Sequence, residues 1–306
     1  MELRRPWRRG PDRLGPARAR LRLRGPGRGE PHDLEPPAAG EPFGADSVLG
    51  RILTMRAIGL PCPEPLAVIR VGGVGWTARG ATPDDAAGWA RELAGLPRCF
   101  TVRPAERPFG TRLAAFTREG RVVRDQYGNV WALPELAELL LAPSADVEWM
   151  VEARAPDHPM LACVLDVGPM PAVVAVTLLG PGELPVLLSA DLAVEPHGGP
   201  VGRRRHGPAR ELLAVDVASG RMVGGGPDAV LPAWGAAQAL IARAARAAPD
   251  HRAMGWDVLL TARGPMLAAA WSPWWGPAGV RARRVVEWAL RDRTLGQPPL
   301  GEPLDP

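Results

Sequence analysis

Three observations predict an α+β fold for this sequence. Strand-like and helix-like segments alternate along the chain without an internal repeat. Several consecutive strand-like segments are separated by turns that contain glycine or proline, which indicates sheet structure. The chain has 306 residues and an apolar content of 46%, which is enough for one large domain or two lobes with a buried core.

The first half of the chain contains one clear signal for the start of a helix and one for a hairpin turn. The stretch Thr82-Pro-Asp-Asp supplies an N-cap, a proline at the first helical position and acids in the first turn. Arg118-Glu119-Gly120 lies between two strand-like pieces and predicts a hairpin turn. We therefore expect a strand at 67–71, a helix from Thr82, a strand at 99–103, a loop to Thr111, a hairpin of 113–116 with 122–124, and a helix at 134–141.

The second half contains most of the sheet signals. Residues 233–247 are rich in alanine and predict a helix, and Ala262-Arg263-Gly264 predicts the turn of a hairpin. Strand-like segments separated by Gly/Pro turns precede that helix. We expect strands at 147–154, 173–179, 184–194 and 212–217, the helix at 233–247, a hairpin over 256–270, and a closing helix at 280–291.

The N-terminal segment is strongly basic and has no sustained apolar period. Residues 1–28 contain ten arginines against Glu2 and Asp12, while the whole chain has a net charge of +4, so the remainder is mildly acidic. We expect residues 1–44 to form a disordered Arg/Pro/Gly-rich tail. Two roles remain open for it: an arm that holds nucleic acid or an acidic partner, or solvated low-complexity chain. The folded part shows no sign of a nucleic-acid-binding face.

The cysteines and the hydropathy pattern argue against a disulfide-rich, zinc-binding or membrane-spanning protein. Cys62, Cys99 and Cys163 are odd in number and widely separated, without CxxC spacing, so neither a disulfide framework nor a zinc site is indicated. No apolar run approaches the roughly 18 residues of a membrane-spanning helix. These features are typical of a cytoplasmic protein that does not enter a membrane.

The most specific stretch is Met254-Gly-Trp-Asp-Val-Leu-Leu-Thr-Ala-Arg-Gly-Pro-Met-Leu-Ala-Ala-Ala-Trp271. It resembles the C-terminal hairpin of ATP-grasp proteins, in particular the sugar-transfer-associated branch related to α-L-glutamate ligases. There, a Gly-Trp-Asp strand leads through Thr-x-x-Gly-Pro to a Glu-x-Asn ending. The resemblance implies an ATP-grasp-like fold of two α+β lobes that enclose a nucleotide cleft, with ATP and Mg²⁺ as cofactors.

The metal ligands of that hairpin are largely missing from this chain. If the turn pairs Thr261 with Pro265, position 257 lies opposite 269, and the period of two places 271 on the same face. Three oxygen ligands would converge there on Mg²⁺ in the family. This sequence offers Asp257, Ala269 and Trp271, and only Asp257 supplies a carboxylate. Asp257 is either a residual metal ligand or a strand carboxylate.

Further matches occur upstream in the expected order. Phe100-Thr-Val-Arg103-Pro104 resembles the family's strand ending in Lys-Pro, so Arg103 is a candidate phosphate contact or an ordinary arginine. Met150-Val-Glu152 resembles the hinge strand, which implies that Glu152 lies near adenine. His158, before a proline, is a candidate active-site residue or a turn residue. Val174 stands where the family usually has an arginine, another polar role lost.

The resemblance implies a domain over residues 45–295, with a smaller lobe at 98–150 and a larger lobe at 151–295. A Pro-rich tail, 296–306, follows. The resemblance also implies two alternative functions for this domain. The first function is that of an ATP-dependent carboxylate-amine ligase, acting through an acyl phosphate on nucleotide and small-molecule substrates, with weak or lost catalysis. The second is a non-catalytic scaffold or regulatory protein that keeps the fold and binds a protein partner.

Overall fold

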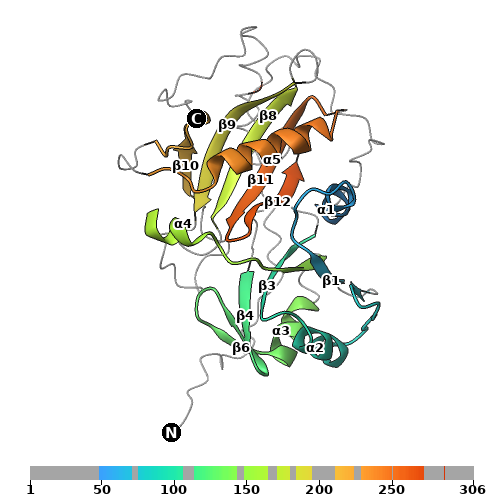
Figure 1. The fold of residues 1–306 in the computed structure, drawn as a ribbon. Helices are drawn as coiled ribbons and strands as arrows, with labels where there is room; N and C mark the ends of the chain where they lie inside the picture. Colours follow the sequence, from blue (N-terminus) through green and yellow to red (C-terminus); the bar gives the residue numbers. More distant parts are fainter. Residues whose placement is uncertain are drawn as a thin grey trace, which may run out of the picture. The chain divides into compact units, whose positions relative to one another are not determined.

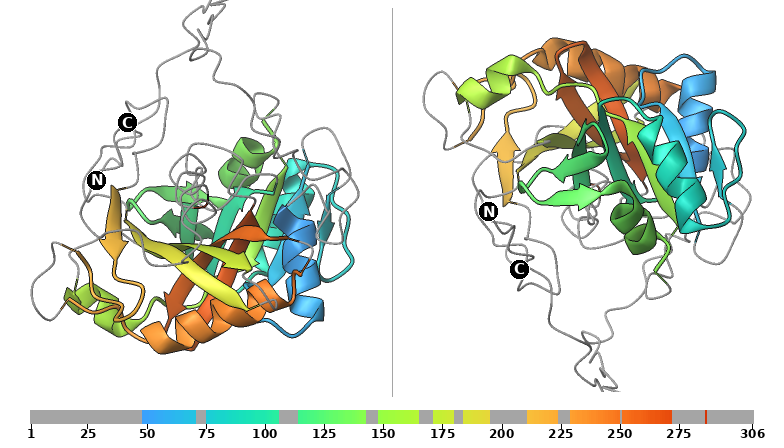
Figure 2. Two further views of the ribbon diagram at one scale, coloured as in Figure 1. Left: turned by 90° about the horizontal axis from the view of Figure 1, so that it is seen from above. Right: turned by 90° about the horizontal axis from the view of Figure 1, so that it is seen from below.

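The computed structural model describes ten stretches of the chain, drawn in colour in Figures 1 and 2. The expected tail at 1–44, the loop from 106 to 111 and the Pro-rich tail at 296–306 lie outside them. So does the expected helix at 280–291, except for residue 286, which is helical. The described residues are 48–70, 75–105, 114–142, 148–164, 171–179, 184–194, 211–223, 229–249, 251–271 and 286.

A seven-stranded sheet forms from the first half of the described chain. Its strand order is β2-β1-β7-β3-β4-β5-β6, and every neighbouring pair is antiparallel. Phe100 and Val102 of β3 belong to the core cluster of this sheet, and five of the six residues of β3 are buried. The strands are β1 (Pro65–Ile69), β2 (Trp76–Thr77), β3 (Cys99–Pro104), β4 (Ala114–Glu119), β5 (Val122–Asp125), β6 (Val130–Ala132) and β7 (Trp149–Ala153).

A five-stranded antiparallel sheet follows, with the order β10-β9-β8-β11-β12. Strand β12 is therefore an edge strand of this sheet. Helix α5 (Trp234–Arg246) packs along one face, in contact with β8, β9, β11 and β12 (Figure 1). The strands are β8 (Ala172–Leu179), β9 (Pro185–Val194), β10 (Glu211–Val215), β11 (Ala253–Thr261) and β12 (Gly264–Trp271).

Short helices complete the two cores. Helices α2 and α3 pack on each other and bury Trp89 and Leu136 with Phe100 of the first sheet. None of the described helices combines the length and the apolar character needed to cross a membrane. Besides α5 they are α1 (Val48–Ala57), α2 (Ala86–Ala94), α3 (Leu133–Leu140) and α4 (Pro159–Val164).

The α+β fold class is confirmed, and most expected elements form within two or three residues of their predicted bounds. The predicted start of α2 at Thr82 is wrong. Asp85 caps this helix, because its carboxylate accepts a hydrogen bond from the backbone N–H of Gly88 at 2.6 Å. The sequence did not predict α1, α4, β2 or β6, of which the last two are strands of two and three residues.

The register of the β11–β12 hairpin differs from the prediction at its turn and agrees with it at the far end. Thr261 pairs with Gly264 instead of Pro265. A β-bulge between Asp257 and Val258 then adds one residue to β12, so Asp257 lies opposite Ala269 as predicted. Ala268 is the residue of β12 left without a Cα partner in this register.

The turn after β10 requires a glycine. Gly220 has a φ of 72°, and a Cβ built on it would lie 2.4 Å from the ring of Trp234. The turn is held by Asp216, whose pKa is lowered by hydrogen bonds from the hydroxyl and the backbone N–H of Ser219. Residues 215–220, which contain Asp216, Ser219 and Gly220, therefore stabilise this turn.

We expect Gly220→Ala to reduce the free energy of unfolding by about 2–4 kcal/mol, because it combines an unfavourable φ with overpacking against Trp234. The matched control is Gly128→Ala. Gly128 has a φ of 86° but no atom within 4 Å of a built Cβ, so this variant carries the backbone effect alone. Urea unfolding of both variants measures the difference, and equal losses would contradict the packing argument.

Candidate functional site

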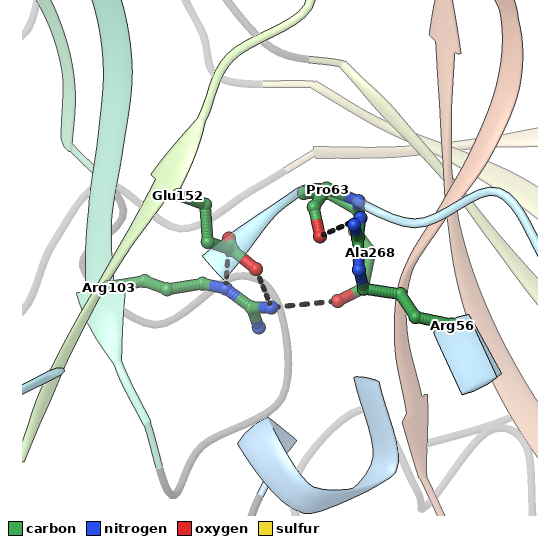
Figure 3. Close-up of polar contacts among 5 residues, drawn as sticks. All are labelled: Arg56, Pro63, Arg103, Glu152 and Ala268. Carbon is green, nitrogen blue, oxygen red and sulfur yellow. Dashed lines mark hydrogen bonds and ion pairs between the residues drawn. The ribbon is translucent and has the colours of Figure 1, made fainter. Parts of the chain in front are cut away.

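Two residues predicted for nucleotide binding form an ion pair with each other. Strands β3 and β7 are adjacent, with Arg103 opposite Met150 and Thr101 opposite Glu152. Arg103 Nε donates to Glu152 Oε2 at 2.8 Å, and Arg103 Nη2 donates to Glu152 Oε1 at 2.9 Å. Both residues are only 1% exposed. The pair is therefore a two-point, charge-assisted contact that is shielded from water (Figure 3).

The same guanidinium also reaches the second sheet. Arg103 Nη2 donates to the carbonyl oxygen of Ala268 at 2.8 Å, as drawn in Figure 3. Ala268 is the extra residue of the β12 bulge, and bulges redirect backbone groups that would otherwise join the ladder. The carbonyl of Ala268, like that of Ala270 two residues on, accepts a hydrogen bond from a group outside the sheet.

Asp257, the predicted metal ligand, accepts a hydrogen bond from within the hairpin. Trp271 Nε1 donates to Asp257 Oδ1 at 2.9 Å, and the two residues are 5% and 2% exposed. The indole lies against Gly255, its partner in the register, where a built Cβ would approach three ring atoms to within 2.4–2.5 Å. Gly255 therefore provides the space that lets the indole reach Asp257.

A second buried carboxylate lies on the same face as Asp257. Asp191 of β9 is opposite Val174 of β8, and Val174 is in turn opposite Asp257 of β11. Residues directly opposite each other project to the same side of a sheet. Asp191 is 6% exposed. Asp191 was not among the residues predicted from sequence, although an aspartate within the apolar strand-like run 184–194 is a visible signal.

His158 has the geometry of a turn residue. The imidazole Nδ1 accepts a hydrogen bond from the backbone N–H of Met160 at 3.2 Å. The backbone N–H of His158 donates to the carbonyl oxygen of Leu260 at 2.9 Å. The side chain is partly exposed at the start of α4. No hydrogen bond in the described part of the chain joins it to Arg103, Glu152 or Asp257, so its predicted nucleotide contact stays a prediction.

The described residues of the hairpin do not fit a Mg²⁺ ion. Magnesium requires several oxygen ligands in a near-octahedral arrangement. One oxygen of Asp257 faces the indole N–H of Trp271, a donor that repels a cation, and the side chain of Ala269 opposite it has no ligand atom. Throughout the described stretches, no group of three or more His, Cys, Asp or Glu side chains is placed to hold a metal.

Cys62 lies close enough to the ion pair for its thiol to feel the charges of Glu152 and Arg103. Burial raises the pKa of its thiol to about 12 from an ordinary value of 9.0, and the charge of Arg56 opposes this only in part. The carboxylate of Glu152 raises the pKa further, and Arg103 lowers it. The thiol therefore stays protonated at neutral pH.

We expect iodoacetamide at pH 8.5 to label Cys99, which is partly exposed, well before Cys62 in the native protein. In urea both thiols should react at similar rates, since the unfolded pKa values are alike. Peptide mass spectrometry over time measures the two rates. As the folded pKa of Cys62 is raised, its contribution to stability is present below about pH 9 and is lost as the pH rises toward 12.

Comparisons with known proteins give structural likenesses only. No protein-family model matches the sequence, and no curated protein matches it. An N5-carboxyaminoimidazole ribonucleotide synthetase solved with ADP aligns with a TM-score of 0.43 and 11% identity, covering 76% of this chain and 46% of that one. D-alanyl-alanine synthetase A from Vibrio cholerae aligns with a TM-score of 0.41 and 13% identity, covering 73% and 54%.

A third likeness is to the ATP-grasp ligase PsnB, solved with a precursor variant, Mg and ADP, with a TM-score of 0.37 and 11% identity. It covers 78% of this chain and 56% of that one. The chain thus spans about half the length of these solved structures. At these scores and identities the likenesses assign neither an activity nor a ligand to this chain, and we therefore argue its function from its own residues.

Proposed function

We propose that this chain is an ATP-grasp-like protein, related to the sugar-transfer-associated ATP-dependent carboxylate-amine ligases, that serves as a non-catalytic scaffold or regulatory protein. The ordered motifs that end at Arg103, Glu152 and Asp257 support the relationship. They fall on β3, β7 and β11, the strands that the resemblance implies. Each of these three side chains is engaged by another part of the same chain.

The hydrogen bond from Trp271 to Asp257 carries the proposal. Metal ions in phosphoryl chemistry stabilise the charge on the transferring group and usually supply a large part of the rate. Here a neutral N–H donor engages the one carboxylate that the hairpin retains, and alanine stands at the position opposite. The hairpin is thus stabilised as a structure without a metal ion.

The ion pair points in the same direction. A nucleotide phosphate that bound through Nε or Nη2 of Arg103 would displace Glu152 and the Ala268 carbonyl, and Glu152 would then be a buried carboxylate without its arginine. Breaking a buried ion pair from one side costs about 3–5 kcal/mol. That energy weakens binding by roughly 10²- to 10³-fold or more. The phosphate contact of Arg103 and the adenine contact of Glu152 stay predictions, and a phosphate contact through Nε or Nη2 requires the ion pair to open.

We expect the purified protein to show no Mg²⁺-dependent ATPase activity and no rise in melting temperature with millimolar MgATP. A ligand that binds only the folded form must raise the melting temperature. The double variant Ala269→Glu with Trp271→Asn, which restores oxygen ligands beside Asp257, should gain Mg²⁺-dependent nucleotide binding by isothermal titration. Robust turnover by the natural protein would refute the proposal and favour the ligase.

An intermediate result is also informative. If the natural protein binds MgATP without turning it over, titration of Arg103→Ala decides whether Arg103 contacts the phosphate. Weaker binding would support that contact and a nucleotide-regulated scaffold. Unchanged affinity would show that the nucleotide binds elsewhere.

A further inference from the structure

The edge strand of the second sheet is covered by groups that belong to other parts of the fold. Among the strands that the structure describes, β12 has β11 on one side and none on the other. Exposed edge strands have unpaired N–H and C=O groups, which native proteins usually cover. Three main-chain groups of β12 have partners outside its sheet: Leu267 N–H donates to Pro61 O at 2.8 Å, Ala268 O accepts from Arg103 at 2.8 Å, and Ala270 O accepts from Arg51 at 2.9 Å.

Strand β11 is tied to the first sheet at the turn end of the hairpin. The chain that leaves β7 forms an isolated bridge between Asp157 and Thr261. His158 N–H donates to Leu260 O, and Ala262 N–H donates to Pro156 O, both at 2.9 Å. Both strands of the hairpin are therefore hydrogen-bonded to segments that lead into or out of the seven-stranded sheet.

Arg103 differs from these other links because it is a side chain that joins three strands at once. It starts on β3, pairs with Glu152 on β7 and bonds to Ala268 on β12 (Figure 3). Its exposed fraction is 1%, so water cannot readily replace either partner. Charge-assisted hydrogen bonds at low dielectric are stronger and more directional than those at a surface.

We propose that Arg103, Glu152 and the Ala268 carbonyl form an internal clamp that holds the two sheets in one fixed arrangement without any nucleotide. The acceptor lies on an edge strand, where a main-chain carbonyl is open to a partner from outside the sheet. The two sheets then unfold and refold locally as one cooperative unit. This inference concerns the motion of the fold, and it holds whether or not the protein binds MgATP.

The wild-type full chain gives the first test. Native-state hydrogen exchange, followed by mass spectrometry at increasing urea below the unfolding transition, resolves units that open separately. Peptides from β3, β7 and β12 should share one opening free energy and one dependence on urea. The clamp is refuted if the hairpin opens at lower urea than β3 and β7.

A variant removes the clamp while keeping the core apolar. Arg103→Met with Glu152→Met replaces a buried ion pair by side chains of similar size, a change that is often tolerated. We expect exchange in the peptide 264–271 to rise at least tenfold relative to a peptide from β9. If that ratio is unchanged in the double variant, the clamp does not hold the sheets together.

Arg118→Met is the matched control. Arg118 lies on β4 and donates through Nη2 to Leu96 O at 3.1 Å, a contact within the first half of the fold. This variant should leave the exchange ratio of 264–271 to β9 unchanged. A comparable rise in the control would show that any lost arginine contact loosens the hairpin, and would overturn the assignment to Arg103. Should the double variant fail to fold, the wild-type experiment decides alone.

Discussion

Glu152→Ala should lower the free energy of unfolding by about 3–5 kcal/mol, among the largest effects we expect from a single substitution in this protein. The change removes both oxygens that accept from Arg103 and leaves the guanidinium with a full charge in a site that is 1% exposed. The remaining bond to the Ala268 carbonyl cannot balance that charge. Urea unfolding monitored by circular dichroism measures the loss.

Glu148→Ala is the matched control for this prediction. Glu148 immediately precedes β7 and pairs with Arg70, whose side chain is 55% exposed. Exposed ion pairs contribute about 0–1 kcal/mol, because water and salt screen them. We therefore expect a loss at least threefold smaller than for Glu152→Ala. Equal losses would mean that burial does not set the strength of the Arg103–Glu152 pair.

The main strands could be predicted from sequence because their apolar runs are long and the turns between them contain glycine or proline. Helix α1 was missed for a physical reason. Its described buried residues include Ile52 and Met55, while Leu53 is 47% exposed, so its apolar residues do not follow one clear face. Strand β2 has two residues, too few to show a period of two.

The positions of the candidate site residues could be read from the ordered motifs, but their pairing could not. Arg103 and Glu152 are far apart in sequence, and each was assigned a separate contact with nucleotide. They meet because β3 and β7 are adjacent and place Thr101 opposite Glu152. Two residues of opposite charge within strongly apolar strands were the available signal, since buried charges are usually paired.

The β12 bulge could not be anticipated from the sequence. The turn was expected to pair Thr261 with Pro265. A regular ladder without a bulge then gives the correct partner for Asp257. The structure reaches the same partner through a tighter turn and one extra residue, Ala268. An alanine among alanines carries no signal of a bulge, and no sequence pattern pairs its carbonyl with the buried Arg103.

Trp271→Ala should be comparably destabilising, with a loss of about 3–5 kcal/mol. The indole is 5% exposed, lies against Gly255 and donates to Asp257, so its removal leaves a cavity beside a buried carboxylate. Trp271→Phe keeps most of the ring on Gly255 and removes the N–H donor. It should therefore lose less, about 1–3 kcal/mol, the cost of leaving a buried acceptor without its donor.

A double-mutant cycle separates the hydrogen bond from the packing. The cycle combines Trp271→Phe with Asp257→Ala and compares urea unfolding of the wild type, both single variants and the double variant. If the indole N–H stabilises the carboxylate directly, the two substitutions should be non-additive, because the second removes a bond that the first has already broken. Additive losses would show that Trp271 acts through packing alone. The proposal that Trp271 engages Asp257 in place of a metal ion would then be contradicted.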